Sequence, residues 1–139
     1  MPTEENKDRV RRALDHFNRS DLEGYLALYA ADAVLHDFGI EPGVENIRLF
    51  YQGFLHAFPD THITIEDLIA TEDRIAERIT LRATHMGNFQ GIPATGRPIT
   101  MAGITILRFQ DGQCVERWTQ GDFLGLMQQI GAIPAPAHA

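Results

Sequence analysis

The chain has no pair of cysteines, because Cys114 is the only one among its 139 residues. A single cysteine excludes an internal disulfide and any zinc site built on several cysteine ligands. We therefore expect a reduced, cytoplasmic compartment. The sequence also has no apolar run near the ~18 residues that a membrane span needs. Its first residues, MPTEENKDRVRR, are charged from the start, so we expect no signal peptide there.

The chain also lacks an excess of positive charge. It has 12 Lys and Arg residues against 19 Asp and Glu residues, which gives a net charge of −7. No basic stripe is available to meet phosphates, so we expect no nucleic-acid partner. No two histidines have the i, i+4 spacing of a helical metal site with an acidic partner, and no glycine-rich loop opens a helix after a strand. We therefore expect no metal, no nucleotide and no other cofactor.

The composition that is present belongs to one ordinary globular domain. Hydrophobic residues make up 44% and charged residues 22% of the chain. A chain of this length buries about two-thirds of the surface that its unfolded form exposes, so its core needs no disulfide or metal ion to be stable. We predict a single domain over residues 1–139, with its core at residues 4–131. Residues 132–139 are rich in Pro and Ala and are expected to form a flexible tail.

Hydrophobic spacing predicts three helices in the first half of the chain. The first runs from Glu4 to Arg19. The second follows a Ser20-Asp21 cap and extends to Tyr29. A short strand over residues 33–38 precedes the third helix, which we expect over residues 44–57.

Alternating apolar and polar residues predict strands in the second half. They are expected over residues 62–70, 74–85, 99–109 and 113–119, before a last short helix at residues 123–130. Helices followed by mostly hairpin-connected strands are an α+β arrangement. A sheet of this kind that curves around a helix leaves a cavity between the two, and we expect a ligand pocket there.

Two stretches of the chain carry motifs of a known family. They are LALYAADAVLHDFG at residues 26–39, followed by Phe58-Pro59-Asp60, and GNFQGIPATGRPITMAGITILRFQDGQCVERWTQGDFLGLMQQIG at residues 87–131. From about Asp8 to Gly131 the chain resembles the SnoaL-like polyketide cyclase family of the nuclear-transport-factor-2-like superfamily. The resemblance implies a cone-shaped, curved antiparallel sheet wrapped around helices, an α+β barrel, with an internal pocket. It also implies a cofactor-free enzyme acting on a small hydrophobic molecule with a carbonyl group. The reaction would be a polyketide-type aldol cyclisation or a proton shift like that of ketosteroid isomerase.

The resemblance assigns roles to three residues. In the characterised cyclases the acid–base group is an aspartate between the last strand and the closing helix, which matches Asp122. A histidine assists that aspartate, and Thr105 takes its place here, with a hydroxyl that can donate a hydrogen bond to an oxyanion. In ketosteroid isomerase the general base ends the first strand, which matches Asp37. Each also has a structural interpretation: Asp122 as a helix N-cap, Asp37 as a turn residue and Thr105 as a strand residue.

Strand parity and residue type add further candidates. His85 shares parity with the inward-facing Ile79, so it could move a proton or support an oxyanion, or simply cap the strand end. His36 and Asp37 have opposite parity, so without a bulge only one of them faces the cavity. We expect catalytic roles for Asp122, His85 and Asp37. We expect substrate contacts from a second set: His36, Thr105, Trp118, Tyr25, Phe54 and Met101.

Two other functions stay open, and one partner is expected. An epoxide hydrolase of the same fold uses an Asp-Arg-Asp set, for which Arg78 or Arg82 would have to face inward. A non-catalytic module would bind a small ligand without converting it. Ile104 and Ile106 lie on the sheet face away from the pocket, and an exposed sheet face of this kind predicts a homodimer.

Overall fold

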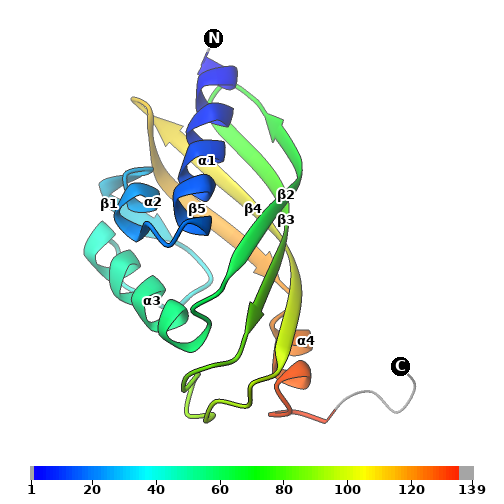
Figure 1. Ribbon diagram of the computed structural model, residues 1–139. Coiled ribbons are helices and arrows are strands. Elements are labelled where there is room, and N and C mark those ends of the chain that lie inside the picture. Colours follow the sequence, from blue (N-terminus) through cyan, green and yellow to red (C-terminus); the bar gives the residue numbers. More distant parts are fainter. Residues whose placement is uncertain (1, 135–139) are drawn as a thin grey trace.

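The computed structural model describes residues 2–134, so the expected tail at residues 132–139 lies mostly outside the described residues. Within that range the chain forms four helices and five strands (Figure 1). Their order is α1 (Pro2–Asn18), α2 (Leu22–Leu26), β1 (Tyr29–Leu35), α3 (Val44–Ala57), β2 (His62–Ala70), β3 (Arg74–Thr84), β4 (Pro98–Gln110), β5 (Gln113–Gly121) and α4 (Phe123–Gln129).

The five strands form one curved sheet in the order β1-β5-β4-β3-β2. The expected α+β class, with a curved sheet around helices, is confirmed, but two details of the expectation are wrong. The sheet is mixed, because β1 runs parallel to β5 while the other pairs are antiparallel. It also ends at β1 and β2 without closing into a barrel. The parallel pair follows from the connection, since the chain leaves β1 through α3 and three strands before it returns as β5.

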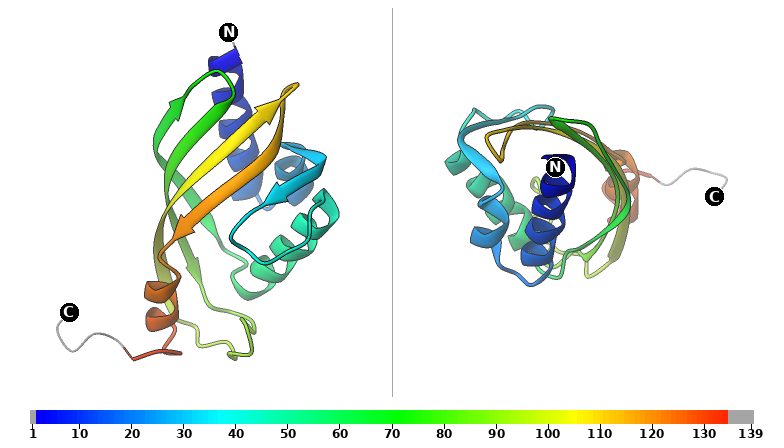
Figure 2. Two further views of the ribbon diagram at one scale, coloured as in Figure 1. Left: turned by 180° about the vertical axis from the view of Figure 1, so that it is seen from behind. Right: turned by 90° about the horizontal axis from the view of Figure 1, so that it is seen from above.

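Helix α1 lies along the concave side of the sheet, which curves around it when the molecule is seen from above (Figure 2). Its buried apolar side chains recur at helical spacing, as the sequence predicts: Val10, Ala13, Leu14 and Phe17. Helix α3 packs against β1 and α2. Its buried side chains are Ile47, Tyr51, Phe54 and Ala57. The concave side of the sheet is therefore covered by two helices.

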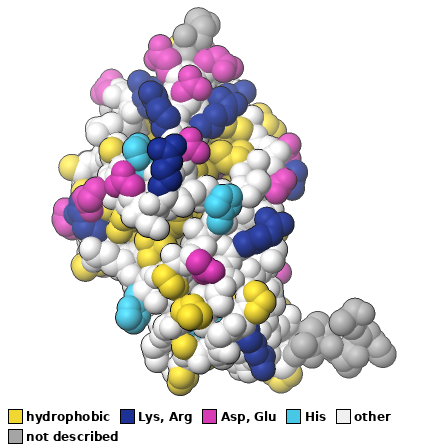
Figure 3. Space-filling model, in the orientation of Figure 1, with side chains coloured by type: hydrophobic (Ala, Val, Ile, Leu, Met, Phe, Trp, Pro, Cys, Tyr) yellow, Lys and Arg dark blue, Asp and Glu magenta, His cyan; other side chains and the backbone are white. Residues whose placement is uncertain are grey.

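Strands β3 and β4 alternate between buried and exposed residues along most of their length. This confirms the predicted parity, in which Ile75 and Ile79 face the helices. Ile104 and Ile106, on the other parity, are 54% and 39% exposed on the outer face. Figure 3 shows the face that α1 covers, where charged side chains gather around the N-terminal helix.

The first half of the chain differs from expectation at both ends of β1. The second helix ends at Leu26, and Tyr29 is already the first residue of β1, where it pairs with Cys114. Asp21 caps this short helix as predicted, by accepting a hydrogen bond of 3.0 Å from the backbone N–H of Gly24. β1 ends at Leu35, earlier than expected, because Asp37 adopts a φ of 72° that a strand cannot continue through.

The buried side chains form two clusters. The larger one joins α1, α2, β1, α3 and the end of the sheet where β3 and β5 begin and β4 ends. The smaller one joins the end of α3, the far end of β3 and β4, and α4. Ile63 packs against both clusters, at the point where a pocket opens between them. None of the helices in residues 2–134 is long and apolar enough to cross a membrane.

Candidate functional site

The pocket opens between the concave face of the sheet and helices α1 and α3, as expected. Its walls leave about 550 Å³ free of atoms, with the open mouth included. Five of the lining side chains are phenylalanines, from both helices, the loop after β1 and the start of α4: Phe17, Phe38, Phe50, Phe54 and Phe123. The strands add aliphatic side chains and a methionine: Ile63, Ile79, Leu81 and Met101. Most of the lining is therefore apolar, which suits a small hydrophobic ligand.

One wall of the pocket is polar, because neighbouring strands bring polar residues into register. Glu77 of β3 lies opposite Thr105 of β4, which in turn lies opposite Thr119 of β5. The hydroxyl oxygens of Thr105 and Thr119 are 3.1 Å apart. In the adjacent row Gly103 pairs with Gly121, and both line the pocket. Without side chains there, a ligand can approach the strand backbone and the threonine hydroxyls.

Arg117 of β5 lies beside this row and contacts all three tyrosines of the chain. Its Nη1 atom is 2.9 Å from the hydroxyl of Tyr25 and 2.8 Å from that of Tyr29. The same atom donates to the hydroxyl of Tyr51. Its Nε atom donates to Oγ1 of Thr119 at 3.1 Å. Residues from α2, β1 and α3 thus hold the guanidinium in one place.

The guanidinium stays charged in this position. Burial lowers the pKa of Arg117, but the three tyrosine oxygens and Glu77 raise it by more, so it lies well above its ordinary value. Burial raises the pKa of Tyr25 and of Tyr29, and Arg117 offsets only part of that effect. Both phenols therefore remain protonated. Arg117 is partly exposed and lines the pocket, so the pocket contains a fixed cation.

A smaller inner chamber continues the pocket toward the core. It shares five lining residues with the pocket: Phe17, Tyr51, Ile63, Ile79 and Arg117. Glu77 lines only this inner chamber and is 6% exposed. Its Oε2 atom is buried without a hydrogen-bond partner among residues 2–134. Burial raises the pKa of Glu77, and Arg117 offsets part of the rise. An unpaired buried polar atom costs about 1–3 kcal/mol, so this carboxyl is kept at the expense of stability.

Asp122 lies at the start of α4, where its carboxylate accepts a hydrogen bond of 2.9 Å from the backbone N–H of Gly125. The structural interpretation as an N-cap is therefore confirmed. The residue is exposed and does not line the pocket, although its neighbours Gly121 and Phe123 do. Asp122 thus lies at the rim, and proton transfer by its carboxylate stays a prediction.

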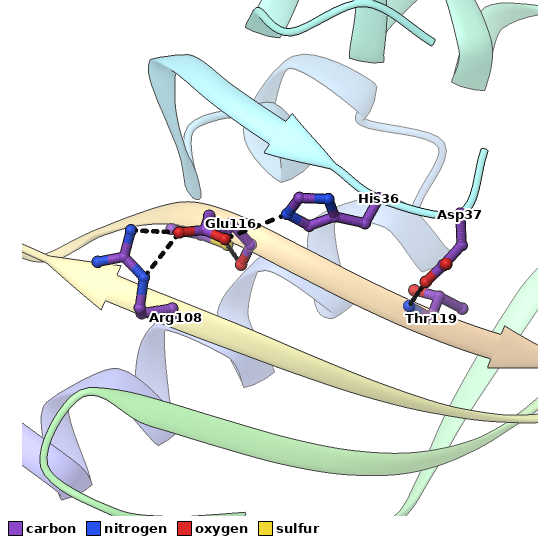
Figure 4. A network of polar contacts seen from close by, with 6 residues as sticks. His36, Asp37, Arg108, Glu116 and Thr119 are labelled. Atoms are coloured by element: carbon purple, nitrogen blue, oxygen red, sulfur yellow. Dashed lines mark hydrogen bonds and ion pairs between the residues drawn. The ribbon is translucent and has the colours of Figure 1, made fainter. Parts of the chain in front are cut away.

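His36 and Trp118 lie away from the pocket, where their rings stack at 5.0 Å between centroids. The guanidinium of Arg74 lies 5.4 Å from the Trp118 ring centroid. Nε2 of His36 is 3.1 Å from the carboxylate of Glu116, which also accepts hydrogen bonds from Arg108 (Figure 4). These side chains form a surface network, and neither His36 nor Trp118 contributes to the pocket lining.

Asp37 lies closer to the polar wall than His36 does. Its Oδ2 atom accepts a hydrogen bond of 3.2 Å from the backbone N–H of Thr119 (Figure 4). The residue is exposed, and its neighbour Phe38 lines the pocket while Asp37 itself does not. Of the two residues with opposite parity, Asp37 is therefore the one beside the candidate site.

His85 is fully buried, at the far end of the sheet and outside the pocket lining. Its ring centroid lies 5.4 Å from that of Phe58, and its Nδ1 atom is 3.0 Å from Oγ1 of Thr95. Its Nε2 atom has no hydrogen-bond partner in the described part of the chain. The loop at residues 86–97 is tied back by hydrogen bonds from Met86 and Gly87 to the carbonyl oxygen of Ala57.

The other predicted contact residues line the pocket or the inner chamber. Thr105, Phe54 and Met101 line the pocket, and Tyr25 lines the inner chamber. Their contacts with a substrate stay predictions.

Sequence reasoning missed the two charged residues of the site. Glu77 stands between Ile75 and Ile79 on the inward parity of its strand, and a charged residue at such a position is the signal that could have found it. Arg117 had a weaker signal, because it stands between Glu116 and Trp118 in the sequence and its pairing with Leu107 of β4 is what shows that it faces inward.

The structure offers few groups for a metal or a nucleophile. Within residues 2–134 no three His, Cys, Asp or Glu side chains come together as a metal site requires. The thiol of Cys114 is fully buried, and burial raises its pKa to about 12. A thiol with this pKa is not a nucleophile near neutral pH.

Comparison with known proteins places this geometry in context. Residues 7–130 match the model of the SnoaL-like polyketide cyclase family. Aklanonic acid methyl ester cyclase DauD of Streptomyces sp. (strain C5) is 25% identical over 136 residues, which cover 89% of this chain and 80% of that protein.

Two solved structures are similar throughout. AclR of Streptomyces galilaeus, a candidate hydroxylase, has 32% identity and a TM-score of 0.89, over 98% of this chain and 87% of that chain. IdmH of Streptomyces antibioticus, a candidate polyketide cyclase, has 34% identity and a TM-score of 0.77, over 91% of this chain and 98% of that chain.

Proposed function

Because this chain belongs to the SnoaL-like polyketide cyclase family, we propose that it closes a ring in a small hydrophobic polyketide by proton transfer, without a cofactor. One observation carries the proposal. An otherwise apolar pocket has a single polar wall, to which Thr105, Thr119 and Arg117 contribute. The cyclase similar to this chain, DauD, supports the substrate class.

A ring closure of aldol type needs three things from a pocket. A base takes a proton from the carbon next to a carbonyl group, donors hold the oxygen of the resulting enolate, and an acid protonates the new alkoxide. Arg117 and the hydroxyls of Thr105 and Thr119 are the donors in this proposal. Such donors are worth about 10²- to 10³-fold in rate when they are fixed in advance.

We propose Asp122 as an acid/base at the rim, since the residues on both sides of it line the pocket. Asp37, which accepts a hydrogen bond from the backbone of Thr119, is the second candidate for this role. His85 is the third, although it lies outside the pocket lining. A proton shift of isomerase type would use the same groups without forming a carbon–carbon bond.

Two alternatives remain beside ring closure. An epoxide hydrolase needs an arginine between carboxylates inside the pocket, and Arg78 and Arg82 are exposed on the outer parity of β3. The inward arginine is Arg117, whose Nη1 atom is already occupied by three phenols. A binding module that converts nothing is the other alternative.

The test is turnover of aklanonic acid methyl ester, followed by chromatography. We expect the wild type to convert it to a cyclised isomer of the same mass. Asp122→Asn should keep the fold, because Asn is as good an N-cap as Asp. It should lose about 10²- to 10⁴-fold in turnover if the carboxylate transfers the proton. Asp67→Asn, an exposed carboxylate of β2, is the matched control and should keep the wild-type rate.

Other outcomes would select another function. Full turnover by Asp122→Asn would remove this residue from the mechanism and make Asp37→Asn the next variant. Tight binding without turnover would favour the binding module, and hydrolysis of a small epoxide to a diol would favour the hydrolase.

We further propose that the outer sheet face joins two copies of the chain. The support is the exposure of Ile104 and Ile106 on that face. Sedimentation that gives a monomer at micromolar concentration would exclude a homodimer. A cytoplasmic location stays a prediction of the same kind.

A further inference from the structure

The carboxyl of Glu77 has no role in the site as described so far. It is 6% exposed, and one of its oxygens has no hydrogen-bond partner in the described part of the chain. It lines the inner chamber together with Arg117, which also lines the pocket. A buried carboxyl without a partner is costly, and here it lines a small chamber that shares five lining residues with the pocket.

Neither protonation state of Glu77 satisfies the chamber. If the carboxyl is ionised, its Oε2 atom lacks a donor. If it is protonated, the charge of Arg117 has only hydroxyl partners, those of the three tyrosines and of Thr119. A ligand that gives up a proton and becomes an oxyanion would satisfy both, because the proton would go to Glu77 and the oxyanion to Arg117.

Four other titratable groups around the chamber already hold their protons. Arg117 is already protonated, because its pKa lies well above the ordinary value. Tyr25 and Tyr29 hold their protons, because burial raises the pKa of each phenol. Cys114, which lies close enough to feel the charge of Glu77, has a pKa of about 12 and holds its proton as well. Asp122 and Asp37 are exposed and line neither hollow.

We propose that Glu77, in place of Asp122, is the base that takes the proton from the ligand, and that Arg117 binds the oxyanion left behind. This deepens the proposed function and rests on it for the natural substrate, a carbonyl compound with an acidic hydrogen. The C–H bond breaks, its hydrogen moves as a proton to Oε2 of Glu77, and the electron pair becomes the enolate. The oxygen of that enolate lies against Arg117 and Thr119. The same proton is available later for the alkoxide formed at ring closure, so Glu77 ends ionised and no further reagent is needed.

The experiment uses 2-naphthol, a flat fused-ring phenol that can ionise but cannot cyclise. Its absorption spectrum distinguishes the bound phenol from the bound naphtholate. Calorimetry in two buffers of different ionisation enthalpy counts the protons released on binding. At pH 7 the wild type should bind naphtholate and release no proton, because Glu77 accepts it.

The variants separate the candidate bases. Glu77→Gln should also bind naphtholate, since Arg117 remains, but it should release one proton per bound probe into the buffer. At pH values below the pKa of the probe, the affinity of this variant should rise about tenfold for each unit by which the pH is raised. Asp122→Asn tests the rival base: it should release no proton on binding if Glu77 is the acceptor, and one proton if Asp122 is. Glu66→Gln, an exposed carboxyl of β2, is the matched control.

Several results would overturn the proposal. They are absence of binding, a bound neutral phenol in the wild type, or one proton released by the wild type. Binding of naphtholate by Glu77→Gln without proton release would also overturn it, because another group would then take the proton. Infrared difference spectra of the wild type test the protonation of Glu77 even if Glu77→Gln does not fold. A protonated carboxyl band must appear when the probe binds, and its absence refutes the role of Glu77.

The probe also separates this proposal from the proposed function. If aklanonic acid methyl ester is not cyclised while naphthol binding follows the expected pattern, the substrate is wrong and the role of Glu77 stands. If cyclisation occurs and Glu77→Gln retains the full rate, ring closure stands and the role of Glu77 is refuted.

Discussion

Tyr29→Phe tests whether the tyrosine cluster around Arg117 stabilises the fold. Tyr29 is 3% exposed and lines neither the pocket nor the inner chamber, so the substitution removes no group that would contact a ligand directly. The substitution removes only a hydroxyl. The ring keeps its edge-on contact with Tyr25, at 5.5 Å between centroids.

The magnitude follows from the two hydrogen bonds that are lost. One joins the hydroxyls of Tyr29 and Tyr25 at 2.6 Å, and the other comes from Nη1 of Arg117 at 2.8 Å. A neutral bond contributes about 1 kcal/mol and a bond to a charged group about 1.5–3 kcal/mol. Arg117 and Tyr25 keep other partners, so the cost lies toward the low end of that sum. We expect the free energy of unfolding to fall by about 2–3 kcal/mol.

The assay is urea unfolding followed by circular dichroism. With a slope of about 2 kcal/mol per molar urea, the midpoint should fall by about 1 M while the slope stays unchanged. Thr80→Val is the matched control, because it removes an exposed hydroxyl that donates to Glu66 at 3.0 Å on the other face of the sheet. It should cost less than about 0.5 kcal/mol. A loss for Tyr29→Phe no larger than that of the control would refute the stabilising role of the cluster.

Two further predictions concern the pocket and the surface network. Gly103→Ala adds a Cβ that meets no atom closer than 3.4 Å, so the melting temperature should stay unchanged. Binding of 2-naphthol should weaken about tenfold or more, because the added methyl group narrows the pocket. Unchanged binding would show that the ligand does not approach Gly103. Hydrogen bonds from Arg108 and then from His36 lower the pKa of Glu116 in the folded state. The ionised carboxylate therefore stabilises the fold above the ordinary pKa of 4.5, and this stabilisation is lost as the pH falls through the lowered pKa of the folded state. The stability difference between the wild type and Glu116→Gln should therefore shrink below pH 4.5, and an acid-denaturation series in which it grows would contradict the network.

Much of the fold could be predicted because the hydrophobic periods are clear. α3 and β2 have the predicted boundaries, Val44–Ala57 and His62–Ala70. The boundary between α2 and β1 could not be predicted. Tyr29 fits either a helix or a strand by its type, and its hydroxyl bonds to Arg117, 88 positions later in the chain. Contacts over such a distance decide local structure without leaving a local pattern.

The pocket lining was predictable where one strand or one helix determines it. Thr105 and Met101 face inward by their parity, and Phe54 lies on the apolar side of its helix. The same parity rule places Trp118 on the outer face of the sheet, away from the pocket. It alternates with Arg117 and Thr119, which line the pocket, so its parity sends it to the opposite face.

The polar wall depends on a different kind of information. Glu77, Thr105 and Thr119 form a row only because three strands pair in one particular register. A shift of one residue in either pair would send one of them to the outer face. The positions of Glu77 and Arg117 therefore follow from strand pairing, which no single segment of the sequence contains.

The arrangement around Arg117 also explains why the cost of a buried charge is tolerated. A guanidinium that bound an oxyanion while free to move would have to be ordered during the reaction, and much of its effect would be lost. Here phenols from α2, β1 and α3 hold it before any ligand arrives. Tyr25 and Tyr29 accept hydrogen bonds from the cation without neutralising it, because burial raises the pKa of both phenols and they keep their protons. A carboxylate in their position would have paired with the charge and left little of it for a ligand, so neutral acceptors are what an oxyanion site requires.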